Sequence, residues 1–409
     1  MMNTNSDWGE RFVRLALAIE EHVPGYVDAY VGPEEWKAQA KQQGKRSLSD
    51  LTTQVNEFEK DLSGTNDMDV QRKDYLARHL MAMQMLLRLL AGEKISITEE
   101  TEALYDIHPE WQNESKLEEP YKILDEFLPT GDSLRERMLI WQRSLEIPIE
   151  KVKELLPLVI NNLHTVTRHK FDLPEEDNFT VEFVSDQPWT AYNWYLGNSQ
   201  SRIQINSDLP TRISELPVLI AHEAYPGHHT DASIKETKLV QALKYYEFTV
   251  NLLNAPSSVM AEGIATTALK TALTKDELEG WFHEELLPAA GMSQIDAKRL
   301  LAIDDAEDKI GRIAGNAAFM LHDQNQSVED ISNYLQRYAL VSEQRAKHLV
   351  RFVSDPYNRS YIFTYDSGRD LLEELFQHGN RDHYVQRVIE EPVTPSLIRQ
   401  WIKDEGKAS

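Results

Sequence analysis

Residues 218–229 read Val218-Leu219-Ile220-Ala221-His222-Glu223-Ala224-Tyr225-Pro226-Gly227-His228-His229. Here several side chains that can do chemistry follow directly after an apolar run. The apolar run predicts a buried helix. A His-Glu pair with a further His one or two turns on is typical of zinc hydrolases, in which imidazoles bind the ion and the Glu acts on its water. We therefore expect the rest of the chain to support a metal-binding helix.

The spacing of this motif departs from the usual HExxH, in which the second His lies about 40° round the helix and about 6 Å along it. In a regular helix His228 would lie about 120° off the His222 face, and His229 would lie on that face but roughly 10 Å along the axis. Pro226 disrupts helical hydrogen bonding and Gly227 accepts most backbone conformations, so a break is predicted there. A break would bring His228 toward His222, so His228 is the favoured ligand and His229 its substitute.

A catalytic zinc site usually has three protein ligands and a water. Glu262 is the candidate third ligand, because it follows a possible serine cap and is surrounded by apolar or small residues. A buried salt bridge is the alternative for this carboxylate. Glu223 is the candidate general base. The ligand types fit Zn²⁺ and also Mn²⁺ or Co²⁺.

The C-terminal third supplies candidate donors for the oxyanion that forms during amide hydrolysis. The available side chains are His322, Tyr361, Tyr365 and Arg369. We expect Tyr365 to stabilise the oxyanion and Arg369 to bind a substrate carboxylate. Ordinary packing or surface pairing is the alternative for each.

Composition limits the partners and the compartment. The chain of 409 residues has 43 basic and 67 acidic residues and a formal charge of −24, which argues against nucleic acid or an anionic membrane as a partner. It has no cysteine, so disulfides and thiolate metal sites are excluded. The N-terminus does not resemble a signal peptide, and no apolar run is long enough for a transmembrane helix. We therefore expect a soluble, cytoplasmic protein. The sequence does not indicate its oligomeric state.

The fold is predicted to be mainly α, a large helical body enclosing an active-site cleft. Apolar residues recur at helical spacing from residue 5 to about 170, whereas residues 178–206 alternate as in short strands. A small antiparallel sheet is therefore expected next to the metal-binding helix. An N-terminal helical region, 1–175, and a catalytic region, 176–409, are expected to form one continuous body. The sheet edge could pair with an extended peptide, although a purely structural hairpin is the alternative.

Two motifs carry a resemblance to a known family. Residues 222–229 followed by Glu262-Gly263-Ile264-Ala265 resemble the HExxPGHH and EGWA pair of the bacterial domain-of-unknown-function 885 family, whose members are often labelled carboxypeptidases. That family is similar in arrangement to Glu-ligand zinc metallopeptidases. Residues 365–368, Tyr-Asp-Ser-Gly, resemble a later element of the family. The chain departs from the family at Ile264, where Trp is usual, and at Asp231, where Gln is frequent.

The resemblance implies a mainly helical fold around a small sheet, Glu223 as the base, and a metal held by His222, His228 and Glu262. These residues predict a zinc-dependent hydrolase, most directly a carboxypeptidase-like metallopeptidase acting on a peptide or small amide. One alternative is a metal-dependent hydrolase of non-peptide amides or esters. Another is a non-catalytic helical binding protein whose His/Glu cluster is structural.

Overall fold

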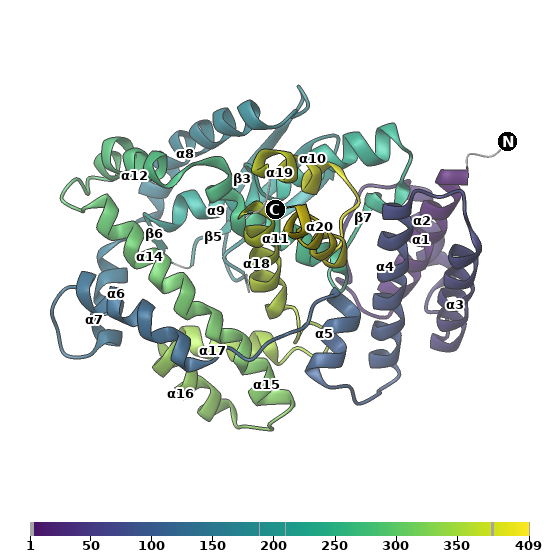
Figure 1. Cartoon of the computed structure of the whole chain (residues 1–409), viewed down its shortest axis with the longest axis horizontal. Coiled ribbons are helices and arrows are strands. Elements are labelled where there is room, and N and C mark those ends of the chain that lie inside the picture. The colour runs from purple at the N-terminus through teal and green to yellow at the C-terminus, as the bar shows by residue number, and fades with distance from the viewer. Residues whose placement is uncertain (1–3, 188, 209, 378–379, 409) are drawn as a thin grey trace.

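The computed structural model describes residues 4–187, 189–208, 210–377 and 380–408. It confirms the mainly α class, with helices surrounding small sheets (Figure 1). The helices of the first part of the chain are α1 (Thr4–Glu20), α2 (Glu34–Gln43), α3 (Leu48–Gly64), α4 (Val70–Leu90), α5 (Ile97–Tyr105), α6 (Glu118–Phe127), α7 (Leu134–Ser144) and α8 (Ile149–Lys170). Those of the second part are α9 (Glu215–Glu223), α10 (His228–Lys235), α11 (Pro256–Ala272), α12 (Lys275–Trp281), α13 (Leu287–Ala289), α14 (Ala297–Gly311), α15 (Asn316–His322), α16 (Val328–Tyr338), α17 (Glu343–Val353), α18 (Ile362–Gln377), α19 (Arg381–Glu390) and α20 (Pro395–Ala408).

Many of these helices begin at a polar side chain that accepts a hydrogen bond from the first helical turn, which satisfies an otherwise unpaired amide. Such caps are Ser47, Asp69, Ser96, Ser133, Asp296, Ser327, Ser342 and Asn380. The helix α12 carries a full capping box, in which Thr274 and Glu277 bond each other's backbone amides. The helix boundaries are thus set by local sequence.

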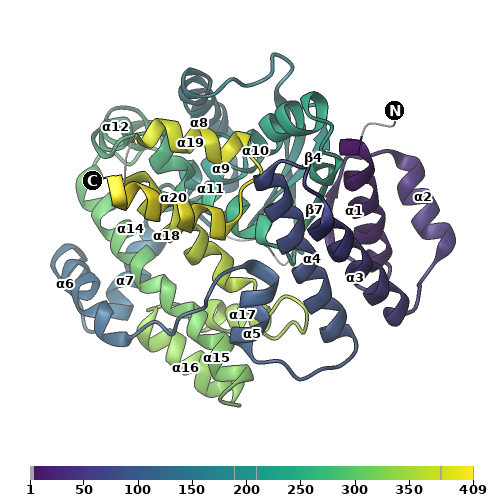
Figure 2. The ribbon, with the colours of Figure 1, turned by 45° about the vertical axis from the view of Figure 1, so that its right-hand side comes forward.

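Two apolar cores hold the helices together, and each draws on sequence from before and after residue 175. The first core contains residues of α1 and α3–α5 together with residues of α11 and α15–α18. The second joins α6–α8 to the sheet, α9, α11, α14 and the C-terminal helices. Figure 2 shows α1–α4 at one end of the molecule and α6, α7 and α12 at the other, as does Figure 1. The two regions expected from the sequence therefore share their cores.

The strands β3 (Asn178–Val184), β4 (Ala191–Gly197) and β5 (Gln200–Asn206) form one sheet in the order β3-β5-β4. The strands β4 and β5 are antiparallel, as expected, but β3 and β5 are parallel, so the sheet is mixed and not antiparallel throughout. The tight turn at Gly197 to Ser199, with positive φ angles, returns the chain along β4 and leaves β5 in the centre. An alternating pattern predicts strands but does not say which strand is the neighbour.

Two further strand pairs flank this sheet. The strand β1 (Val27–Tyr30) pairs antiparallel with β7 (Val250–Leu252), and β2 (Glu146–Ile147) pairs antiparallel with β6 (Thr211–Arg212). The β1–β7 pair joins parts of the chain that are more than two hundred residues apart. It forms one wall of the cavity described below.

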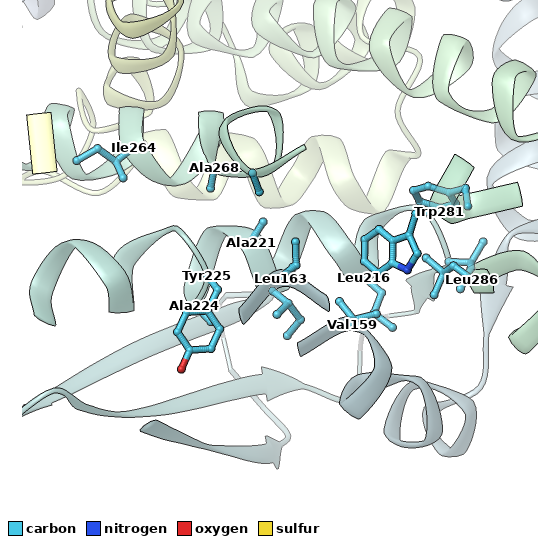
Figure 3. Close-up of a cluster of buried hydrophobic side chains, with 14 of the residues drawn as sticks. Val159, Leu163, Leu216, Ala221, Ala224, Tyr225, Ile264, Ala268, Trp281 and Leu286 are labelled. Carbon is cyan, nitrogen blue, oxygen red and sulfur yellow. The ribbon is translucent and has the colours of Figure 1, made fainter. Parts of the chain in front are cut away.

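The helix α9 packs between α11 on one side and α8 with the sheet on the other, although Val218 of its apolar run is 51% exposed. Figure 3 shows Leu216 and Ala221 of α9 between Ala268 of α11 and the side chains of Val159 and Leu163 of α8. These apolar contacts fix the helix that ends in His222 and Glu223. Within the ranges described above, no helix is long and apolar enough to cross a membrane.

The helices α11 and α18 touch through their backbones. A Cβ atom on Gly263 would lie 2.7 Å from the carbonyl oxygen of Gly368, and one on Gly368 would lie 2.2 Å from the carbonyl oxygen of Val259. Both separations are shorter than any side chain allows, so each position requires glycine. The close approach places Glu262 of α11 beside the tyrosines at the start of α18.

Candidate metal centre

The helix carrying the motif breaks where the sequence predicts. The first helix, α9, ends at Glu223, and α10 begins at His228. At the break, a Cβ atom on Gly227 would lie 1.9 Å from the carbonyl oxygen of His222 and 2.3 Å from that of Ala221. The chain thus folds back so tightly onto the last turn of α9 that only glycine fits.

The break brings the two predicted histidine ligands to one place. One ligand atom each from His222, His228 and Glu262 lies within 4.8 Å of the other two. The Nε2 atom of His222 is 3.5 Å from Oε2 of Glu262, and the rings of His222 and His228 are 4.7 Å apart and nearly perpendicular. We call these three residues the cavity cluster. Their convergence is the geometry that the motif predicts.

The cavity cluster fits a metal ion by its chemistry. Glu262 is only 6% exposed. Its Oε1 accepts a hydrogen bond of 2.8 Å from the Tyr361 hydroxyl, whereas its buried Oε2 has no hydrogen-bond partner. A buried carboxylate oxygen without a partner is costly, and a cation would satisfy it. Two imidazoles and one carboxylate form a donor set of the kind that zinc, manganese or cobalt accepts.

Burial also keeps the imidazoles of His222 and His228 unprotonated. It lowers the pKa of His222 to about 4. It lowers the pKa of His228 well below its ordinary value, with smaller effects from His222 and Lys235 in the same direction. Both rings are therefore neutral at neutral pH, and a neutral ring is the form that binds a metal. Burial raises the pKa of Glu262 to about 7, so this carboxylate ionises fully only when a cation is near.

The candidate base, Glu223, lies in the same cavity. Burial, followed by the negative charges of Glu262 and Asp28, raises the pKa of its carboxyl to about 8. Its backbone carbonyl accepts a 2.5 Å hydrogen bond from the Asn193 side chain of β4, which joins the sheet to the end of α9. A carboxyl whose pKa lies near neutrality can both take and return a proton.

The adjacent histidine, His229, faces away from the cavity cluster. Its Nδ1 is 2.7 Å from Ser201 Oγ and its Nε2 is 2.7 Å from Asp177 Oδ1. Asp177 also accepts a 2.8 Å hydrogen bond from the Tyr225 hydroxyl. We call His229, Asp177, Ser201 and Tyr225 the sheet cluster. Both ring nitrogens of His229 are occupied in a fully buried position, so His229 is not brought to the site as a substitute for His228.

Two tyrosines of the C-terminal region reach the cavity. Tyr361 and Tyr365 both line it, and their rings lie 5.6 Å apart. Burial, followed by the charges of Glu262 and Glu223, raises the pKa of Tyr365 well above its ordinary value. Its hydroxyl therefore keeps its proton and can donate a hydrogen bond. Tyr361, which the sequence marks only as one of several donors, is the residue that holds Glu262.

Arg369 is not brought to the site. Its Nη1 donates to both carboxylate oxygens of Asp308 on α14, at 2.6 and 2.9 Å, and its Nη2 donates to Asp366. It is absent from the described residues that line the cavity. Arg369 follows Tyr365 by one helical turn, but two carboxylates draw its guanidinium toward α14 instead. The sequence gives no sign of these partners.

The cavity has a volume of about 430 Å³, within the size range of small-molecule sites. Besides the cavity cluster, Glu223 and the two tyrosines, its wall includes side chains that the sequence does not single out. These include Asp28, Tyr192, Asn193, Lys235 and Asn251. They come from β1, β4, α10 and β7, which are far apart in the chain, so no local pattern connects them.

Comparison with known proteins supports the fold alone. No family model matches the sequence, and no curated protein matches it. Among solved structures, the chain is similar to a protein of Colwellia psychrerythraea described as a "putative lipoprotein", with 14% identity over 91% of this chain and 72% of that one and a TM-score of 0.53. A protein of Shewanella oneidensis, described as a "putative lipoprotein of unknown function", aligns at 12% identity over 90% of this chain and 76% of that one, with a TM-score of 0.47. At these identities the first likeness shows a shared fold.

Proposed function

We propose that this protein is a metal-dependent hydrolase, with zinc as the first candidate ion and peptides as the first candidate substrates. One observation carries the proposal. The ligand atoms of His222, His228 and Glu262 converge around a buried carboxylate oxygen that has no partner, at the wall of a cavity that also contains Glu223. Such a set has little use as packing, since each unpaired polar group costs free energy.

The roles of the residues follow from their positions. His222, His228 and Glu262 would hold the ion. A zinc ion, when bound, acts as a Lewis acid and lowers the pKa of water toward about 7. Glu223 takes a proton from the attacking water and delivers it to the leaving nitrogen. Its raised pKa makes both transfers possible within one cycle.

Tyr361 and Tyr365 have different roles in the proposed reaction. Tyr365 donates a hydrogen bond to the carbonyl oxygen as negative charge develops on it, which is the role of an oxyanion hole. Tyr361 keeps Glu262 in place through its 2.8 Å hydrogen bond and leaves the second carboxylate oxygen free for the ion. The first residue would contact substrate, and the second would position a ligand.

The peptide class draws support from two features. Residues 222–229 and 262–265 resemble motifs of a family labelled as carboxypeptidases, and the edge strand β4 lines the cavity next to the cluster. An extended peptide can pair with such an edge. Hydrolysis of non-peptide amides or esters is the alternative. Carboxypeptidase specificity rests on the family resemblance, because Arg369 lies outside the cavity.

The test is a comparison of Glu223→Gln with the wild type after incubation with zinc. We expect both proteins to bind about one equivalent of metal and the variant to lose about 10³-fold in peptide hydrolysis, because removal of a general base costs about 10²–10⁴-fold. The control is Glu215→Gln, which changes a carboxylate of the same helix outside the cavity. Wild-type turnover by Glu223→Gln would contradict the proposed base. Less than a tenth of an equivalent of metal would favour the non-catalytic binding protein.

The cytoplasmic location expected from the sequence stays a prediction. Cell fractionation tests it directly, because a cytoplasmic protein is recovered with the soluble fraction and a membrane-anchored one with the pellet. Recovery in the pellet would contradict it.

A further inference from the structure

One cavity residue has no place in the proposed chemistry. Asp28 lies on β1 and is partly accessible from the cavity. Its Oδ1 accepts a hydrogen bond from the Tyr192 hydroxyl, and its Oδ2 accepts one of 3.0 Å from the Asn251 side chain. A carboxylate can accept about four hydrogen bonds, so each oxygen retains acceptor capacity. Both partners are neutral, and no ion pair is formed by Asp28 in the described part of the chain.

Two other carboxylates of the cavity, Asp231 and Glu236, already have partners. Asp231 forms an ion pair of 2.6 Å with Lys235. Glu236 accepts hydrogen bonds from the Tyr195 hydroxyl and from the backbone amide of Asn198. A divalent ion would offset the carboxylates of Glu223 and Glu262. Asp28 and Glu236 are then the cavity carboxylates without an ion pair in the described part of the chain. The four acceptor positions of Glu236 are taken by neutral donors, whereas Asp28 has two donors and retains acceptor capacity.

The charge of Asp28 influences the ionisable groups in and beside the cavity cluster. Its negative charge raises the pKa of Glu223, of Glu262 and of Tyr361. Burial raises the pKa of Asp28 itself to about 6, with the Asn251 hydrogen bond acting in the opposite direction. Asp28 is therefore mainly ionised at neutral pH, and a cation placed between it and the cluster would be attracted to it.

We propose that Asp28, oriented by Tyr192 and Asn251, binds the free α-ammonium group of a peptide substrate, so that hydrolysis takes place near the amino end of a short peptide. This inference rests on the proposed function and specifies its substrate class. An ammonium group has three donors and a full positive charge, which suits the remaining acceptor positions of Asp28. The rings of Trp189 and Tyr192, 5.6 Å apart on the cavity wall, offer faces that attract a cation.

The same cavity is poorly suited to a free substrate carboxylate. Lys235 is the one permanently charged cation among the described residues that line it, and this lysine is already paired with Asp231. Arg369, the cation that the sequence suggests for this task, is bound to Asp308 and Asp366 outside the cavity. A carboxylate entering the cavity would meet an excess of negative charge. The charges therefore favour the amino end of a peptide over its carboxyl end.

The test uses the zinc-loaded protein and three tripeptides of one sequence, with alanine and leucine series run in parallel. The first has a free amine and an amidated carboxyl end, the second is acetylated and amidated, and the third is acetylated with a free carboxyl end. Loss of one partner of a buried charge pair costs about 2–5 kcal/mol. We therefore expect kcat/KM for the first peptide to exceed that for the second by about 30-fold or more.

Variants connect this preference to Asp28. Asp28→Asn should lower the ratio between the first two peptides by about 30-fold. Because the ratio compares two substrates on one enzyme, it cancels any effect of the Asp28 charge on Glu223. The control Asp172→Asn changes an exposed aspartate and should keep the wild-type ratio. Preference for the acetylated peptide with the free carboxyl end, a wild-type ratio below about 3, or an unchanged ratio in folded Asp28→Asn would overturn the proposal.

A binding measurement separates this inference from the proposed function. The probe is the amidated tripeptide with a free amine, titrated into zinc-loaded Glu223→Gln with and without the additional change Asp28→Asn. If the peptide binds through its amine but the wild type hydrolyses no peptide, the proposed function is contradicted and the ammonium site is supported. If the wild type hydrolyses peptides without preference for a free amine, the ammonium site is contradicted and the proposed function is supported. If Asp28→Asn fails to fold, the ratio of kcat/KM for the first two peptides is compared between the wild type and Tyr192→Phe, which removes one group that orients Asp28.

Discussion

His228 and His229 are neighbours in the chain but belong to two different kinds of polar cluster. In the sheet cluster, His229 is fully buried and both ring nitrogens have partners at 2.7 Å. In the cavity cluster, the imidazole rings of His228 and His222 form no hydrogen bond within the part of the chain that the structure describes, and Glu262 has one oxygen without a hydrogen-bond partner. Polar groups that satisfy one another hold a fold together, whereas convergent groups left unsatisfied beside a cavity are prepared for a ligand.

The largest expected effect comes from exchanging the two histidines for alanine. His228→Ala should weaken zinc binding by more than about 100-fold, because even residues that only orient a metal ligand contribute about 10–100-fold. Its free energy of unfolding without metal should change little. His229→Ala should instead lower the free energy of unfolding by about 3 kcal/mol, because it leaves Oδ1 of the buried Asp177 carboxylate and the buried Ser201 hydroxyl without the imidazole.

Zinc titration against a competing chelator and urea unfolding of the metal-free proteins measure the two effects. If His229→Ala does not fold, Ser201→Ala removes only one partner of the ring and serves in its place, with zinc affinity close to that of the wild type. Strong zinc binding by His228→Ala, or weak binding by folded Ser201→Ala, would break the distinction between the clusters.

A second, smaller effect tests how the cavity cluster is positioned. Gly368→Ala should lower the free energy of unfolding by about 1–3 kcal/mol, as overpacking does, because its Cβ would meet the Val259 carbonyl. It should also weaken metal binding by moving Glu262 relative to Tyr361. The matched control is Gly280→Ala in α12, where a Cβ meets nothing within 4 Å and a gain of about 0.5–1 kcal/mol is expected. Equal behaviour of the two variants in urea unfolding would contradict the close crossing.

The last prediction concerns His79, a buried histidine that lies outside both clusters and affects stability only at acidic pH. Its Nδ1 is 2.7 Å from the Tyr75 carbonyl oxygen, whereas its buried Nε2 has no partner. It does not line the cavity, so an unpaired nitrogen alone does not make a ligand site. Burial lowers the pKa of His79 to about 4, below the value of about 6.5 in an unfolded chain.

The neutral ring of His79 therefore stabilises the fold fully above about pH 6.5, and this contribution is lost as the pH falls toward about 4. Between these limits His79 should change the free energy of unfolding by about 1.4 kcal/mol per pH unit. The variant His79→Asn, which does not titrate, should show a slope that is smaller by this amount. Parallel slopes for the two proteins in urea unfolding between pH 6.5 and 4.5 would show that His79 is protonated in the fold.

The sequence predicts what is encoded locally. The helix break follows from Pro226-Gly227, and the approach of His222 to His228 follows from the break. The sequence singles out Glu262 as a candidate ligand because a lone carboxylate among apolar residues is unusual. The roles of these residues in metal binding and catalysis stay predictions.

What the sequence could not predict depends on partners far along the chain. Asp28 reaches the cavity because β1 pairs with β7, more than two hundred residues later, and nothing in four residues of strand signals that pairing. Arg369 is turned away by Asp308 of another helix, although its spacing from Tyr365 suggests a shared face. The parallel pairing of β3 with β5 likewise depends on the path of a loop and not on the strand pattern.

The contact between Gly263 and Gly368 has a consequence for how such a protein can diversify. It is made by backbone atoms, so it sets the distance from Glu262 to Tyr361 and Tyr365 independently of the side chains elsewhere on the two helices. The wall that would select a substrate is built from other elements, β1, β4 and β7. Most of the selective surface therefore lies on other elements than the reactive groups. Substitutions in the strands can change which molecule enters without disturbing those groups, except at Asn193 and Asp28, which act directly on Glu223.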